Sequence, residues 1–192
     1  IEGNWFANDF TGLAPPWDDN MVYSPHKYWS PVDDEYLDWL VQDTLTTPTF
    51  VGETGENSNL WYRDAIKLYE DNGISWAWWP FKRIDAIQPP LSINYNEKYK
   101  KIVDYWNSGN DKPSKEDAIA GLTQLTEDIK FENCFYHKDI IDAMFRQPFS
   151  DETVPYAENI IPGIIYSTNF DMGIMGSAYY DAGADANYGG DF

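Results

Sequence analysis

A glutamate at the end of a short apolar run is the residue of this chain best placed to do chemistry. Residues 49–53 form a β-branched and aromatic run that ends on Glu53, and Gly55 follows in the next turn. A parallel strand that ends on a carboxylate delivers it to the carboxyl edge of the sheet, where (β/α) barrels hold their catalytic groups. We therefore predict that Glu53 is catalytic; the alternative is a helix cap or a salt bridge at a strand end.

Two aromatic-rich segments flank this run. His26 and Tyr28 form a His-x-Tyr pair upstream, and Trp76 and Trp79 belong to the run 74–79 downstream. A tyrosine hydroxyl can donate to a carboxylate and hold it ionised and aimed, and a flat indole can stack on the C–H face of a sugar. The alternative for each of them is a purely structural role in the core.

Strand and helix signals alternate around these residues. We expect strands at 21–23, 49–53 and 74–79, and helices at 33–45, between caps at 57–59 and Gly73, and at 97–106, 115–129 and 138–145. This alternation with short connections is typical of a parallel α/β fold. Only about three βα units fit before residue 110, whereas a closed barrel needs eight.

The composition and net charge of the chain exclude several kinds of binding partner. The 192 residues carry 32 acidic and 13 basic side chains, which gives a net charge of −19. Such a surface repels phosphate backbones, so we expect no nucleic-acid partner. No run of about 18 apolar residues is present, so we expect no membrane span. Cys134 is the single cysteine, so an internal disulfide is excluded. We predict no protein partner.

At this spacing, the chain resembles a known enzyme family. Residues 1–108 resemble the second half of the catalytic barrel of glycoside hydrolase family 5, the cellulase-like family. Segments 20–28, 48–53 and 74–79 resemble the sixth, seventh and eighth strands of that barrel, and residues 3–5 resemble the loop after the fifth strand.

The resemblance implies a role for each candidate residue. Glu53 is the nucleophile of a retaining glycosidase, Tyr28 holds it, and His26 binds the substrate or the acid/base network. Trp79 forms the floor of the sugar site, with Trp76 the second choice by register. The residues that the resemblance assigns to substrate binding are thus Trp79, Trp76 and Trp5.

One part of the family pattern is missing. The general acid/base of the family is a glutamate preceded by asparagine, and no Asn-Glu pair lies upstream of Glu53; the pair at 96–97 lies downstream and opens a helix. We expect the chain to be a fragment that lacks this residue, which belongs upstream of Ile1, and to be inactive alone. A signal peptide is likewise absent from the 192 residues.

The C-terminal segment carries a second, weaker resemblance. Residues 161–192 are similar to the start of a carbohydrate-binding module of family 6, which folds as a β-sandwich. The calcium-ligating glutamate of that family is replaced by Thr168 here, so we predict no cofactor, and calcium is doubtful. Three acids, Asp181, Asp185 and Asp191, could form an oxygen-rich calcium loop, although a solvated turn is the simpler interpretation.

Together these observations predict an α/β fold: the C-terminal half of a (β/α)8 TIM barrel at 1–110, a helical connector and linker at 111–160, and the beginning of a β-sandwich at 161–192. We predict a secreted, cell-surface or periplasmic glycosidase fragment that acts on β-linked polysaccharide. The alternative is a non-catalytic carbohydrate-binding protein with a degenerate barrel. A nucleotide-binding doubly wound domain is disfavoured, because no glycine-rich phosphate loop follows any strand.

Overall fold

The computed structural model describes residues 1–29, 31–40 and 47–180. The chain is a mixed α/β protein with two three-stranded sheets. It divides into two compact units, one formed by residues 1–79 with the segment from Lys138 onward, the other by residues 80–137. The last helix, at Lys138–Phe145, belongs to the first unit although it is far from residues 1–79 in sequence. The predicted domain boundaries at 110 and 160 stay a prediction.

The first sheet is parallel, with its strands in chain order. It contains β1 (His26–Lys27), β2 (Phe50–Thr54) and β3 (Ser75–Trp78). The N-terminus is bonded to the segment before β1: the Ile1 ammonium donates to the Val22 carbonyl at 2.7 Å, and the Ile1 carbonyl accepts from the Ser24 N–H at 2.7 Å. A parallel ladder in chain order confirms the predicted parallel α/β arrangement of this region.

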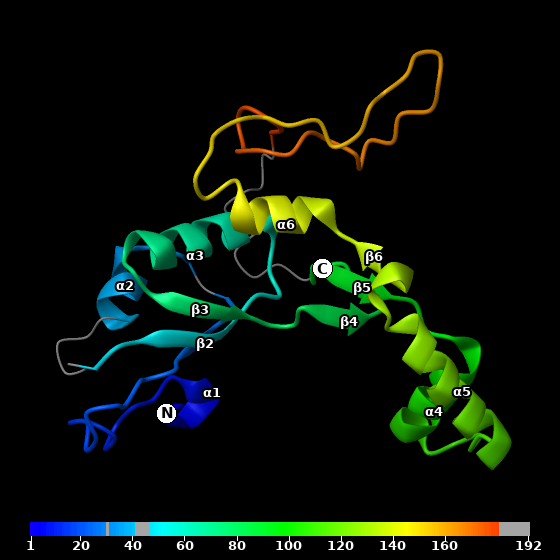
Figure 1. The fold of residues 1–192 in the computed structure, drawn as a ribbon, viewed down its shortest axis with the longest axis horizontal. Coiled ribbons are helices and arrows are strands. Elements are labelled where there is room, and N and C mark those ends of the chain that lie inside the picture. Colours follow the sequence, from blue (N-terminus) through cyan, green and yellow to red (C-terminus); the bar gives the residue numbers. More distant parts are fainter. Residues whose placement is uncertain (30, 41–46, 181–192) are drawn as a thin grey trace. The chain divides into compact units, whose positions relative to one another are not determined.

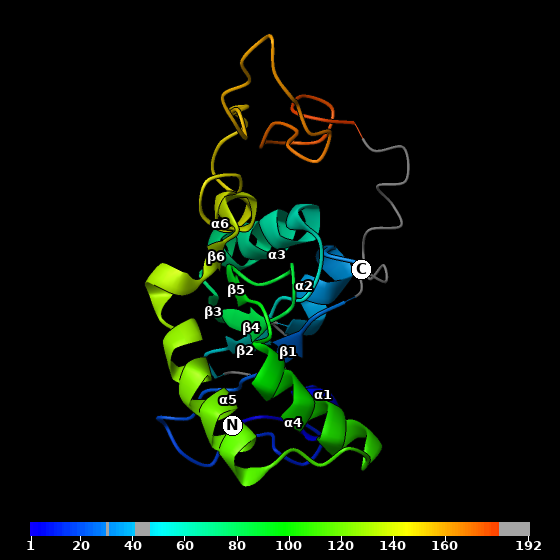
Figure 2. The same cartoon turned by 90° about the vertical axis from the view of Figure 1, so that its right-hand side faces the viewer.

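Two helices lie side by side across one face of this sheet. They are α3 (Asn59–Asp71) and α6 (Lys138–Phe145), and the N-terminal loop lies on the opposite side (Figures 1 and 2). A third helix, α2 (Asp34–Leu40), adds Leu40 to the same core. The fully buried members of this core are large and mostly aromatic or aliphatic: Trp61, Tyr62, Tyr69, Ile66, Val51, Leu40 and Met144.

Local signals explain where α3 begins and ends. The Ser58 hydroxyl accepts from the Trp61 N–H at 3.3 Å, so it caps one of the free N–H groups of the first turn. After the last turn, Gly73 takes φ +66°, a left-handed conformation that costs glycine little. Both boundaries agree with the sequence prediction.

The second unit contains a small mixed sheet and a helical hairpin. Its strands are β4 (Lys82–Ile84), β5 (Leu91–Ile93) and β6 (Phe135–Tyr136), and its helices are α4 (Glu97–Ser108), α5 (Lys115–Asp128) and a 3-10 turn at Phe131–Asn133. Gly121 lets α5 approach α4 closely, because a Cβ there would lie 2.7 Å from the Tyr99 nitrogen. Helices at 97–106 and 115–129 were predicted; the sheet was not.

The segment after α6 is held by an arginine rather than by a sheet. Arg146 is paired with Asp142 at 2.5 Å and donates to the Glu152 carbonyl at 2.5 Å and the Met172 carbonyl at 3.4 Å. Residues 161–180 form turns and one isolated bridge, Met175 with Tyr179, and a second bridge joins Met172 to Val154. The predicted start of a β-sandwich therefore stays a prediction. Its last part, with Asp181, Asp185 and Asp191, lies outside the described residues, as does the predicted helix beyond Leu40.

A short segment of the N-terminal loop is helical only in its hydrogen bonding. In α1 (Asn4–Ala7), Trp5 and Phe6 have φ of +43° and +56°. The prediction of a loop for residues 3–5 agrees with this backbone. No helix in the described part of the chain combines the length and the apolar character needed to cross a membrane.

Candidate functional site

Three predicted residues meet at the carboxyl ends of neighbouring strands. His26 pairs in register with Glu53, which stands next to the last residue of β2. The Tyr28 hydroxyl donates to Glu53 Oε2, and His26 Nδ1 lies 3.3 Å from the same oxygen. The side chain of Glu53 is one-third exposed (33%), whereas that of His26 is 14% exposed. The carboxylate is thus held from one side and open to solvent on another.

The hydroxyl of Tyr28 remains a donor at this position. Burial, and then the hydrogen bond to Glu53 and the charges of Glu53 and Glu56, raise the pKa of Tyr28 well above its ordinary value. A tyrosine that keeps its proton can only donate to a carboxylate, so the contact fixes the direction in which Glu53 points.

Asn57 fixes the backbone of Tyr28. Its side-chain amide donates to the Tyr28 carbonyl at 2.9 Å, and its own N–H donates to the buried Tyr62 hydroxyl at 2.8 Å. Asn57 is almost fully buried. This chain of bonds ties the Tyr28–Glu53 pair to the core of the first unit.

Two glycines shape the strand and turn around Glu53. A Cβ on Gly52 would lie 2.1 Å from Ser24 Oγ and 3.5 Å from His26 Nε2, so Gly52, Ser24 and His26 share one face of the sheet. Gly55 has φ +146°, and a Cβ there would lie 2.2 Å from the Trp79 carbonyl oxygen. Only glycine allows the turn after Glu53 to pass so close to the end of β3.

The three predicted sugar-binding tryptophans occupy different environments. Trp79 donates its backbone N–H to the Thr54 carbonyl at 2.9 Å, beside Glu53, and its side chain is 52% exposed. Trp5 is exposed in the N-terminal loop. Trp76 packs against the core, and its indole N–H donates to Glu70 at 2.9 Å.

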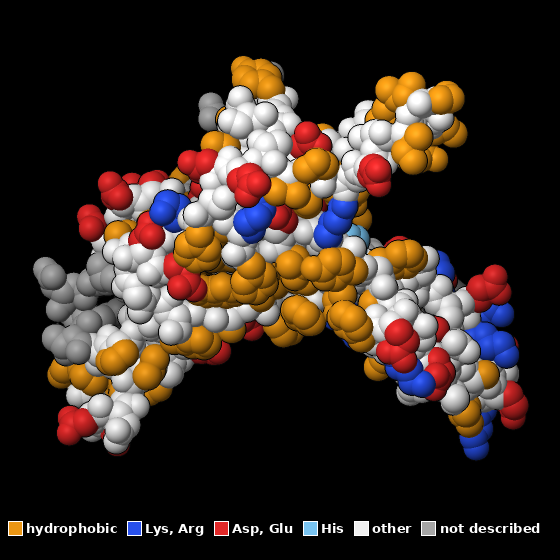
Figure 3. Space-filling model, turned by 45° about the horizontal axis from the view of Figure 1, so that its top comes forward, with side chains coloured by type: hydrophobic (Ala, Val, Ile, Leu, Met, Phe, Trp, Pro, Cys, Tyr) orange, Lys and Arg blue, Asp and Glu red, His pale blue; other side chains and the backbone are white. Residues whose placement is uncertain are grey.

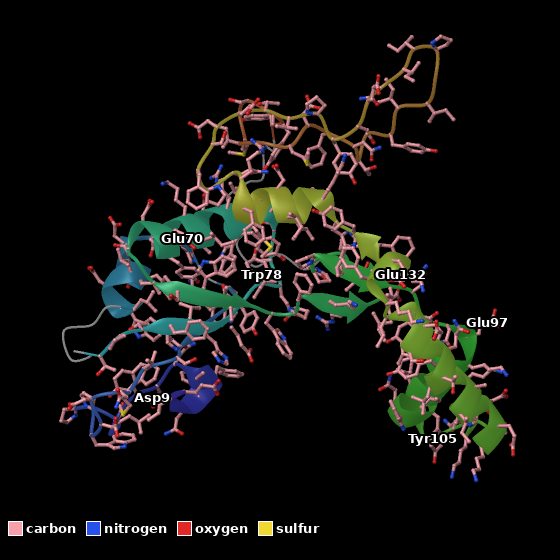
Figure 4. All side chains as sticks on the ribbon, in the orientation of Figure 1. Asp9, Glu70, Trp78, Glu97, Tyr105 and Glu132 are labelled. Carbon is pink, nitrogen blue, oxygen red and sulfur yellow. The ribbon has the colours of Figure 1, made fainter. Side chains whose placement is uncertain are left out.

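The contacts of Trp76 place it with the helices rather than with Glu53. Its ring lies 6.1 Å from that of Trp78 and 6.1 Å from that of Phe145 in α6. Figure 4 labels two of the residues that contact Trp76, Glu70 and Trp78. Figure 3 shows that hydrophobic side chains are exposed at the surface in that view. Of the two tryptophans considered for the sugar floor, Trp79 is therefore the one beside the carboxylate.

The site contains a second carboxylate, that of Glu2, which the sequence did not predict. Glu2 Oε1 lies 3.3 Å from His26 Nε2, so the imidazole stands between Glu2 and Glu53. Asn8 adds a contact to the backbone of His26, because its side-chain oxygen accepts from the His26 backbone N–H at 3.0 Å. Both residues come from the loop before β1, about 20 positions from His26, and no local pattern connects them to it.

The part of the chain that the structure describes contains no candidate metal-binding site. Residues 1–29, 31–40 and 47–180 contain no group of three or more His, Cys, Asp or Glu that could hold an ion. The prediction that no cofactor is needed stays a prediction. The arrangement at Glu53 instead offers a positioned carboxylate, a hydroxyl donor and an exposed aromatic ring.

Comparison of the chain with protein-family models, with curated proteins and with solved structures finds no match.

Proposed function

We propose that the chain carries the nucleophile side of a retaining glycoside hydrolase that acts on β-linked polysaccharide. The observation that carries this proposal is the contact of Tyr28 and His26 with the same oxygen of Glu53 at the end of β2. A nucleophilic carboxylate must be aimed at the anomeric carbon and held in place, and the two contacts do both.

The fold of the first unit supports this proposal. Consecutive parallel strands with their helices on one face are the arrangement of a (β/α) barrel, whereas a doubly wound sheet reverses its strand order and carries helices on both faces. The strands here stand in chain order, and α3, α6 and α2 contribute to one core on one side of the sheet. We propose that this unit is part of such a barrel.

The proposed reaction has two steps. Glu53 attacks the anomeric carbon through Oε1, since Tyr28 and His26 contact Oε2, and the bond to the leaving oxygen breaks as a general acid protonates that oxygen. Water then gives a proton to the conjugate base of that general acid, attacks the anomeric carbon of the glycosyl-enzyme and releases Glu53 as a carboxylate. Trp79 supplies an apolar platform beside the reacting sugar. A secreted, cell-surface or periplasmic location belongs to the same proposal, because polymeric glycans are found there.

An activated substrate tests the nucleophile without a general acid. A 2-deoxy-2-fluoro-β-cellobiosyl fluoride loses fluoride, which needs no protonation, and leaves the 2-fluorocellobiosyl group bonded to the attacking carboxylate. We expect intact mass spectrometry to show one adduct and peptide mapping to place it on Glu53. The mannobiosyl and xylobiosyl analogues complete the panel.

Matched variants make the result specific. Glu53→Gln should abolish the adduct, whereas Glu56→Gln, three residues away in the same turn, should keep it. Tyr28→Phe removes a hydrogen bond to a charged group, worth about 1.5–3 kcal/mol, so adduct formation should slow by about 10- to 150-fold. Lack of any adduct, or an adduct on another residue, contradicts the proposal. Sugar binding without an adduct would favour a non-catalytic carbohydrate-binding protein.

A further inference from the structure

The strand of Glu53 lies between two strands that are each followed closely by an exposed tryptophan. The sheet order is β1-β2-β3, so β2 with Glu53 is the middle strand. Trp29 follows β1 after Tyr28, and its side chain is 74% exposed; Trp79 follows β3 directly and is 52% exposed. All three strands are parallel, so both tryptophans lie at the same edge of the sheet as Glu53.

The backbone that carries Trp29 is fixed by a buried lysine. Lys27 is only 4% exposed, and its ammonium donates to the Trp29 carbonyl at 3.3 Å and to the Pro31 carbonyl at 3.0 Å. The same ammonium lies 3.7 Å from the centre of the Tyr36 ring. Asn57 holds the preceding carbonyl, that of Tyr28. An exposed indole on an anchored backbone is a preorganised platform, because little conformational freedom is lost when a ligand binds.

We propose that Trp29 is a second sugar platform and that Trp29 and Trp79 bind an oligosaccharide on the two sides of Glu53. This inference deepens the proposed function and rests on it. Neighbouring strands lie about 4.8 Å apart, so the strand ends that carry the two tryptophans are separated by about 10 Å. Two aromatic platforms that follow the strands on either side of Glu53 suit a ligand of more than one sugar, so we expect an oligosaccharide to bind more tightly than a single sugar.

Binding measurements test this proposal independently of cleavage. The probes are cellohexaose, mannohexaose and xylohexaose, titrated by calorimetry into the full chain. For the sugar that binds, we expect Trp29→Ala and Trp79→Ala each to weaken affinity at least about tenfold, which corresponds to about 1.4 kcal/mol. Trp29→Phe keeps an aromatic face and should retain most of the affinity. Trp106→Ala removes a tryptophan of similar exposure (65%) from α4 and should leave the affinity for the sugar unchanged.

The outcomes separate this inference from the proposed function. If Trp29→Ala binds the hexasaccharide as tightly as the parent chain, or if none of the three sugars binds, the inference is refuted. If both tryptophans are required for sugar binding but no adduct forms on Glu53, the two sugar platforms are supported and the hydrolase proposal is refuted. If the adduct forms and only Trp79→Ala weakens sugar binding, the proposal that Trp29 is a second platform is refuted, and Glu53 is still supported as the nucleophile.

Discussion

The buried lysine next to the site predicts an unusual dependence of stability on pH. Burial lowers the pKa of Lys27 from 10.5 to about 8, although the charge of Asp33 opposes the shift. Between pH 8 and 10.5 the unfolded chain therefore binds more protons than the folded chain at this residue. The free energy of unfolding rises with pH wherever the unfolded state binds more protons. The contribution of Lys27 is thus lost as the pH falls through 8 and is complete only above 10.5.

The magnitude follows from the two pKa values. At pH 7 the lysine is charged in both states, so its titration contributes nothing. At pH 9.5 the difference between a folded pKa of about 8 and an unfolded value of 10.5 amounts to about 2 kcal/mol. In the folded chain, burial raises the pKa of Tyr69 to about 12 and that of Tyr36 well above its ordinary value, so neither loses its proton in this window. In the unfolded chain they titrate equally in the parent and in the variant, so their contribution cancels in the comparison.

The assay compares the parent chain with Lys27→Met, which removes the titrating group and keeps a similar length. Urea unfolding is followed by tryptophan fluorescence at pH 7, 8.5 and 9.5. All tryptophans except Trp106 lie in residues 1–79, so the signal reports mainly on the first unit. We expect the parent chain to gain about 2 kcal/mol over the variant between pH 7 and 9.5. A difference that stays constant or falls over this range contradicts the lowered pKa of Lys27.

Three further substitutions test contacts described above. Gly55→Ala combines a φ of +146° with a Cβ 2.2 Å from the Trp79 oxygen, so we expect a loss of about 2–5 kcal/mol in urea unfolding and loss of sugar binding. Gly121→Ala should destabilise α4 and α5 by about 1–3 kcal/mol, seen as faster amide exchange, whereas helix propensity alone predicts a gain. Arg146→Met releases the carbonyls of Glu152 and Met172, so limited proteolysis should cut residues 156–170 faster, while Arg83→Met should leave that rate unchanged.

Much of the first unit was predictable because its signals are local. A serine cap, an apolar face at helical spacing and a glycine in the left-handed region mark α3 within 16 residues of sequence. The strand that carries Glu53 was also predicted from a short pattern, at 49–53 against the observed Phe50–Thr54. The strand before it was predicted too early, at 21–23, whereas β1 is His26–Lys27 and pairs His26 with Glu53. The contact between Tyr28 and Glu53 is a consequence of that register.

The features that sequence reasoning missed depend on contacts between distant segments. The return of α6 to α3 joins Asn59 to Asp139 by a 2.8 Å hydrogen bond across 80 positions. Glu2 reaches His26 from a loop with no regular period. Lys27 resembles a surface residue in sequence, since its partners are backbone carbonyls and ring faces that composition does not reveal.

The position of Glu2 bears on how His26 works in the proposed reaction. The imidazole lies 3.3 Å from a carboxylate oxygen at each nitrogen, so a protonated ring can donate to both Glu2 and Glu53, whereas a neutral ring can donate to only one. Without Glu2 the ring keeps its contact with Glu53, because Nδ1 still lies 3.3 Å from Glu53 Oε2. Glu2→Gln should therefore preserve the Glu53 adduct and leave its rate close to that of the parent chain, whereas His26→Ala removes a contact of the nucleophile and should slow the reaction. A rate in His26→Ala equal to that of the parent chain would contradict a role of His26 in aiming Glu53 and leave Tyr28 as the residue that does so.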